Sequence, residues 1–142
     1  MFLFILAATL KSQPQNHYMN IMEVNNADTG KIGDITYSFS NGILTFSGAE
    51  YFPIESFQPP WYAYSSNIKE IIIENGLKSF DPRIDKKLCY DHLTKISIPE
   101  SITYFSLYGF HNSPALSSIV LDENNQGYTI HNGALYSKNY DE

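Results

Sequence analysis

The stretch NIKEIIIENGLKSF (residues 67–80) recurs as HLTKISIPESITYF (residues 92–105). The two stretches are equally long, and when one is aligned on the other, their apolar positions coincide. The coinciding pairs are Ile68 with Leu93, Ile71 with Ile96, Ile73 with Ile98, Leu77 with Ile102, and Phe80 with Phe105. A third copy begins at Leu116, after a slightly shorter interval, and continues with Ile119 and Leu121. The chain therefore contains an internal repeat.

The spacing of this repeat is typical of a leucine-rich repeat, in which apolar residues follow L-x-x-L-x-L within a unit of about 20–29 residues. One such strand cannot bury enough apolar surface alone, so successive copies must stack. The outward residues between the inward ones are then available to solvent. We expect two inward rows, formed by Ile71, Ile96 and Ile119 and by Ile73, Ile98 and Leu121.

The composition is that of one folded unit. The chain has 142 residues, 43% of them hydrophobic, which is enough for one compact domain. Its net charge of −6 disfavours nucleic acid as a partner, because phosphate binding requires clustered lysine and arginine.

The N-terminus, MFLFILAATL (residues 1–10), resembles the apolar core of a secretory signal, although no basic residue precedes it. It is too short to span a bilayer. We expect residues 1–12 to be a signal peptide and the protein to be secreted or held at the cell surface, with no membrane span in the mature chain. A buried terminal strand is the alternative. Cys89 is the only cysteine, so it gives no information on the compartment.

The segment GDITYSFSNGILTFSG (residues 33–48) predicts a β-hairpin around Asn41-Gly42. This turn pairs Phe39 with Leu44 and Tyr37 with Phe46 on an apolar face. The opposite face carries hydroxyl groups, as a half-buried hairpin requires. We expect the hairpin to pack on the start of the repeats.

The following arm, AEYFPIESFQPPWYAYSS (residues 49–66), is rich in aromatic residues and proline. We expect neither a regular helix nor a central strand there. Trp61, Tyr62 and Tyr64 precede the first repeat and are expected to cover its exposed end. Alternatively, their rings form a carbohydrate-binding surface.

The order of these motifs resembles the BspA-like leucine-rich repeat surface proteins of bacteria and anaerobic protists. The resemblance rests on ITYSFSNGILTFSG, PPWYAY, the two repeats quoted above and ALSSIVLDENNQGYTIHNGALYSKN (residues 115–139). It implies a surface protein that binds other proteins or adheres to host or matrix components. The segment RIDKKLCYDH (residues 83–92) departs from the family pattern, and the chain stops at Glu142 after a Leu-Tyr turn where the family continues. We therefore expect a short or truncated member.

The predicted fold class is an α/β leucine-rich-repeat solenoid with short parallel β-strands, loops and little helix, preceded by an antiparallel hairpin cap. The expected division is a signal peptide over residues 1–12, the hairpin and arm over residues 13–66, and about three repeats over residues 67–142.

Two groups of residues invite a chemical interpretation, and spacing disfavours both. Cys89-Tyr90-Asp91-His92 places a thiol beside an acid and an imidazole, but residues adjacent in sequence seldom converge as a catalytic triad. Asp122 to Gly127 begins like a calcium loop, yet Gly133 occupies the twelfth position, where an EF-hand needs a bidentate acid. A looser calcium site and a polar loop between repeats remain open for this segment. We expect no catalytic residue, no metal site, no cofactor and no enzymatic activity.

The most informative surface is formed by the side chains of the predicted strands that point outward. Ile72, Ser97 and Val120 alternate with the inward residues, so two apolar side chains are expected on the outside. An apolar centre with a polar rim is typical of a protein interface, although strand propensity alone also explains both residues. The predicted binding surface comprises Glu70, Ile72, Glu74, Lys95, Ser97, Ser118, Val120 and Asp122. We predict extracellular or host-surface proteins as partners, with glycans as the alternative through the aromatic arm.

Overall fold

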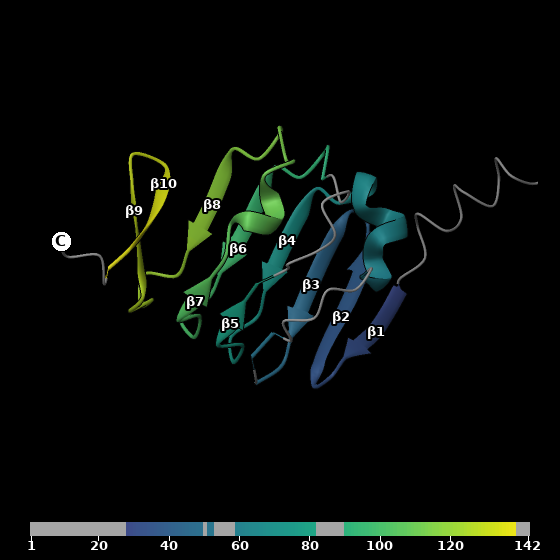
Figure 1. Ribbon diagram of the computed structural model, residues 1–142, viewed down its shortest axis with the longest axis horizontal. Helices are drawn as coiled ribbons and strands as arrows, with labels where there is room; N and C mark the ends of the chain where they lie inside the picture. Colours follow the sequence, from purple (N-terminus) through teal and green to yellow (C-terminus); the bar gives the residue numbers. More distant parts are fainter. Residues whose placement is uncertain (1–27, 50, 53–58, 82–89, 139–142) are drawn as a thin grey trace, which may run out of the picture.

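A computed structural model describes residues 28–49, 51–52, 59–81 and 90–138. Within these ranges strands predominate, and the helical segments are two short 3-10 helices, η1 (Pro60–Asn67) and η2 (Tyr108–Phe110). Six strands form one long sheet in the order β1-β2-β3-β4-β6-β8, which Figure 1 shows side by side. These strands are β1 (Asp28–Ile32), β2 (Ile35–Ser40), β3 (Ile43–Ser47), β4 (Glu70–Ile73), β6 (Lys95–Ile98) and β8 (Ser118–Leu121).

The three repeats supply β4, β6 and β8, which pair in parallel as the sequence predicts. Ile71 lies beside Ile96, and Ile96 lies beside Ile119. Burial decreases along this row, because Ile71 and Ile96 are fully buried whereas Ile119 is half-buried at the edge of the sheet. The predicted stacking of the repeats is confirmed.

The hairpin of β2 and β3 has the predicted register, with Tyr37 opposite Phe46 and Phe39 opposite Leu44. Asn41 and Gly42 both have positive φ, of 52° and 83°, as a two-residue hairpin turn requires. The expectation that the hairpin packs on the repeats needs correction, because β3 pairs in parallel with β4 and extends the same sheet. Strand β1, which the sequence did not predict, adds a further antiparallel edge beside β2.

A second, smaller sheet pairs β5 (Ser79–Phe80) in parallel with β7 (Tyr104–Phe105). Its inward rings face those of the long sheet across the core, since the ring centroids of Phe46 and Phe80 lie 5.1 Å apart. Phe105 and Phe110 continue the stack from Phe80, with nearly parallel rings. The core therefore lies between the two sheets, and η1 and η2 lie on the same side of the long sheet as β5 and β7 (Figure 1).

The aromatic arm differs from the prediction in two respects. Residues 60–67 form a 3-10 helix, which begins at a Pro-Pro pair because proline is tolerated in the first turn of a helix. The arm also does not cover the end of the first repeat, since β3 occupies that edge. Trp61 instead packs against Tyr37 and Phe46, on the inner face of the hairpin, with ring centroids 5.5 and 4.9 Å away.

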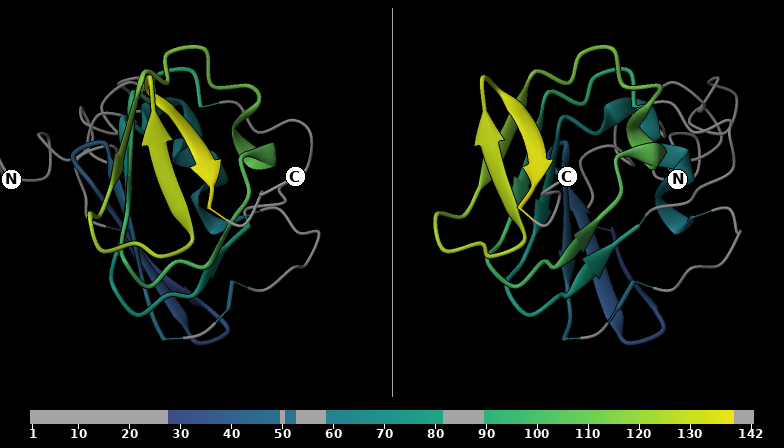
Figure 2. Two further views of the ribbon diagram at one scale, coloured as in Figure 1. Left: turned by 90° about the vertical axis from the view of Figure 1, so that its left-hand side faces the viewer. Right: turned by 60° about the vertical axis from the view of Figure 1, so that its left-hand side comes forward.

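A second hairpin, β9 (Tyr128–His131) and β10 (Ala134–Ser137), follows the third repeat. Figure 2 shows it at the end of the stack, in front of the coils. Tyr128 and Leu135 pack against the core, and the hydroxyl of Tyr128 accepts a hydrogen bond of 2.7 Å from the amide of Phe105. The hairpin thus covers part of the apolar surface that the third repeat leaves open.

Several sequence predictions fall outside the described residues. These are the signal peptide over residues 1–12, the irregular segment up to Cys89 and the last residues of the chain. The proposed boundary between residues 66 and 67 remains a division by sequence pattern, because strands on both sides of it share the long sheet. Within the described parts of the chain, neither helix is long and apolar enough to cross a membrane.

Candidate functional site

The outer face of the long sheet, which points away from the core, is the candidate functional surface. The pairing register aligns one outward residue from every strand into a continuous row, which we call the central row. No residue in it carries a charge. The central row consists of Thr29, Ser38, Thr45, Ile72, Ser97 and Val120.

The structure brings the predicted surface residues together. Glu70, Lys95 and Ser118 form a second row beside the central row. Glu74 and Asp122 are exposed and directly follow β4 and β8. All eight predicted residues therefore lie on or beside the outer face of the three repeat strands.

The apolar residues of this face differ in exposure. Val120 is 47% exposed on the edge strand, whereas Ile72 is half-buried between its neighbours on β3 and β6. Ile43, which is 37% exposed, lies beside Glu70 and adds an apolar residue from the hairpin. The sequence did not predict that strands β1, β2 and β3 add residues to this face, because it did not indicate that the hairpin extends the sheet in plane.

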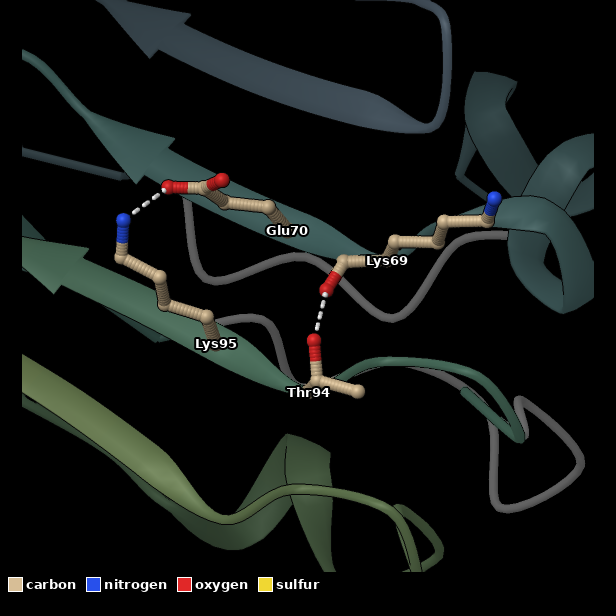
Figure 3. Close-up of polar contacts among 4 residues, drawn as sticks. All are labelled: Lys69, Glu70, Thr94 and Lys95. Atoms are coloured by element: carbon tan, nitrogen blue, oxygen red, sulfur yellow. Dashed lines mark hydrogen bonds and ion pairs between the residues drawn. The ribbon is translucent and has the colours of Figure 1, made fainter.

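Two opposite charges of the second row, Glu70 and Lys95, are paired with each other (Figure 3). Lys95 Nζ lies 2.8 Å from Glu70 Oε1 on the adjacent strand. Just before these residues, the hydroxyl of Thr94 donates a hydrogen bond of 3.1 Å to the carbonyl of Lys69. An exposed ion pair of this kind stabilises a fold by only about 0–1 kcal/mol. Its main effect here is to leave no net charge between the two strands.

The aromatic arm does not offer the three-ring surface that the carbohydrate alternative requires. Trp61 is 1% exposed, and its indole N–H donates a hydrogen bond of 3.0 Å to the hydroxyl of Tyr90. Tyr64 is stacked on Phe39 at 5.0 Å and donates a hydrogen bond of 2.6 Å to Asp28. Of the three rings, only Tyr62 is substantially exposed, at 36%.

The calcium-like segment is used as a structural turn. Asn125 is buried, and its side-chain amide donates to the carbonyls of Pro99 and Ile102, at 2.8 and 3.0 Å. Its side-chain oxygen accepts hydrogen bonds from the amides of Gly127 and Tyr128. This oxygen is therefore directed at backbone N–H groups. In the described ranges, no three His, Cys, Asp or Glu residues are grouped as metal ligands would be.

Two tyrosine hydroxyls in the core have shifted pKa values. Burial raises the pKa of Tyr90 far above its ordinary value, and the hydrogen bond from Trp61 opposes part of this rise. Burial also raises the pKa of Tyr37, and the nearby Asp28 carboxylate acts in the same direction. His92, from the Cys-Tyr-Asp-His segment, is exposed, and Cys89 lies outside the described residues.

Comparison with known proteins finds similar solved structures but no matching family model or curated protein. One similar solved structure is a leucine-rich repeat protein from Eubacterium ventriosum, with a TM-score of 0.37 and 17% identity over 81% of this chain and 49% of that one. Another is the pneumococcal vaccine antigen PcpA, with a TM-score of 0.34 and 12% identity over 80% of this chain and 55% of that one. The chain thus spans about half the length of each.

Proposed function

We propose that this protein is a binding module that presents the outer face of the long sheet to a protein partner. The observation that carries the proposal is the central row, which runs uncharged across all six strands. Ile72 and Val120 give it an apolar part, and hydroxyl groups give it hydrogen-bonding capacity. Protein interfaces combine an apolar core, depleted in charge, with a polar rim.

The polar rim is supplied by the flanking residues. Glu70 and Lys95 are paired with each other, so a partner need not neutralise either charge. Asp122 and Glu74 are exposed at the strand ends, where charges steer association more than they set affinity. A repeat sheet of this kind offers a broad surface on regular strands, which suits the recognition of a folded protein.

Charge placed on the outer face tests this proposal. Replacing Ile72 and Val120 with lysine puts two ions at the centre of the interface, where desolvation without a partner is costly. We expect capture of a matrix protein from an extracellular-matrix extract to fall at least tenfold while the thermal melt stays close to that of the parent. Thr129→Lys combined with His131→Lys, both on the exposed terminal hairpin, also introduces two lysines and is the control, which should bind like the parent. Full capture by the double variant would refute the proposal.

We further propose that the chain is a leucine-rich-repeat solenoid of the BspA-like type, non-enzymatic, and that it is secreted or displayed at the cell surface to adhere to host or matrix proteins. The order of the hairpin, arm and three repeats in the sequence supports the family, and the apolar run MFLFILAATL supports export. Fusing residues 1–13 to a reporter tests the compartment. Export of the reporter is the expected result, and its retention in the cytosol would remove the support for secretion.

A further inference from the structure

A second ordered row of side chains lies on the opposite side of the molecule, on the smaller sheet. Tyr51 forms an isolated parallel bridge with Ser79, and Ser79 in turn pairs with Tyr104 of β7. Tyr51, Ser79 and Tyr104 are therefore side by side on three successive coils. We call these three residues the tyrosine row.

The two tyrosines point outward. Phe52, Phe80 and Phe105, the residues that follow each member of the row, are buried, and the Phe80 ring contacts the other two. Since successive side chains of a strand alternate between faces, Tyr51 and Tyr104 face solvent. The exposed fractions agree, at 62% for Tyr51 and 47% for Tyr104.

The residue between the two rings is small and held in place. Ser79 is only 6% exposed, and its hydroxyl accepts a hydrogen bond of 2.9 Å from the amide of Phe52. No large side chain of the row therefore projects between the two phenol rings. The backbones that carry the two rings are two strand spacings apart, or about 9.5 Å, which is close to the length of one disaccharide unit in an extended glycan.

We propose that Tyr51 and Tyr104 bind a neutral, extended glycan chain in which every second sugar presents the same face, as in β-1,4-linked hexoses. The apolar face of one sugar packs on each ring, while the phenol hydroxyls serve as donors and acceptors. The three residues of the row are uncharged, and the net charge of −6 disfavours an anionic glycan. This site uses Tyr51 from the start of the arm and is distinct from the group of Trp61, Tyr62 and Tyr64, whose Trp61 is buried.

The spacing makes a specific demand on ligand length. A disaccharide covers one ring, whereas a trisaccharide places its first and third sugars on both. We expect the affinity for β-1,4-linked oligosaccharides such as chitooligosaccharides to rise by about tenfold from the disaccharide to the trisaccharide, since the second ring adds one stacking contact. The α-1,4-linked series, maltose to maltotriose, follows a curved path and should show no such step.

Calorimetric titration of the full chain with both series tests the proposal. Tyr51→Ser and Tyr104→Ser should each abolish the step between disaccharide and trisaccharide, while Tyr136→Ser, at a tyrosine of similar exposure (51%) on β10, should keep it. The variant with lysine at Ile72 and Val120 should also bind trisaccharide like the parent, which separates this site from the outer face. The proposal is overturned if no β-1,4-linked oligosaccharide binds, if the step survives both tyrosine replacements, or if the row binds only a proline-rich peptide.

Discussion

The indole N–H of Trp61 donates a 3.0 Å hydrogen bond to the hydroxyl of Tyr90, and both side chains are 1% exposed. This contact joins η1, at the hairpin end of the molecule, to the chain that leads into the second repeat. Tyr90 in turn contacts Phe110 of η2, with ring centroids 5.8 Å apart. One buried hydrogen bond therefore connects the hairpin part of the core to the repeat part.

Removing the acceptor of this bond should be costly. In Tyr90→Phe the indole N–H of Trp61 remains buried without its partner, and we expect the free energy of unfolding to fall by about 1–3 kcal/mol. Urea denaturation monitored by tryptophan fluorescence measures this change. Tyr62→Phe, at an exposed ring on the same helix, should change stability by less than about 0.5 kcal/mol. Equal stability of the two variants would show that the bond contributes nothing.

Alkaline pH should destabilise the fold through its buried tyrosines. The pKa values of Tyr37 and Tyr90 are raised by burial, so the unfolded chain loses these protons first, near its ordinary pKa of about 10. The contribution of these two tyrosines to the free energy of unfolding is therefore complete below that pH, and it is lost as the pH rises above it. Urea midpoints measured from about pH 8 to about pH 11 should be level at first and then decline. The urea midpoint of Tyr37→Phe should decline less steeply with pH than that of the parent. An identical slope would show that Tyr37 does not contribute to the loss of stability.

The turn after β4 requires glycine at position 76. Gly76 has a φ of +113°, and a Cβ atom there would lie 2.8 Å from the carbonyl oxygen of Gly48. Gly76→Ala should therefore cost at least about 1–3 kcal/mol of stability. At Gly127 a Cβ atom would meet its nearest neighbour at 3.5 Å, so Gly127→Ala should cost less than about 1 kcal/mol. Chemical denaturation of both variants compares them, and similar losses would argue against strain at Gly76.

Stability should depend on position along the inward row. Ile96 lies in the middle and is fully buried, whereas Ile119 lies on the edge strand and is half-buried. Ile96→Ala should cost about 2–5 kcal/mol through the cavity it leaves, and Ile119→Ala less than about 2 kcal/mol. Thermal and urea unfolding measure both losses. A larger loss at Ile119 would mean that the third repeat is better covered in solution than β9 and β10 cover it here.

The sequence predicted the parts of the fold that a local pattern specifies. The constant interval between the apolar positions of the first two repeats predicted that Ile71 and Ile96 stack, and Asn41-Gly42 predicted the turn between β2 and β3. The same dipeptide recurs at Asn132-Gly133, where both φ values are again positive. That signal is sufficient to predict the hairpin of β9 and β10.

Other features depend on tertiary contacts that the sequence pattern does not carry. Strand β1 has little apolar character because it is an edge strand, and only the Gly33-Asp34 turn indicates it. The eight sheet-face residues followed directly from strand alternation. The tyrosine row did not, because the interval from Tyr51 to Ser79 is longer than the repeat interval that separates Ser79 from Tyr104. Only the register observed in the structure places Tyr51 beside the second sheet.

The most direct test of the central proposal is site-specific photo-crosslinking from the central row. Benzoylphenylalanine is introduced in place of Ser97, which lies between Ile72 and Val120, and in a second variant in place of Tyr136 on the terminal hairpin. Both variants are irradiated with the matrix protein that the parent chain captures. The account predicts a covalent adduct from position 97 and none from position 136. Adducts from position 136 alone would place the partner on another surface and contradict it.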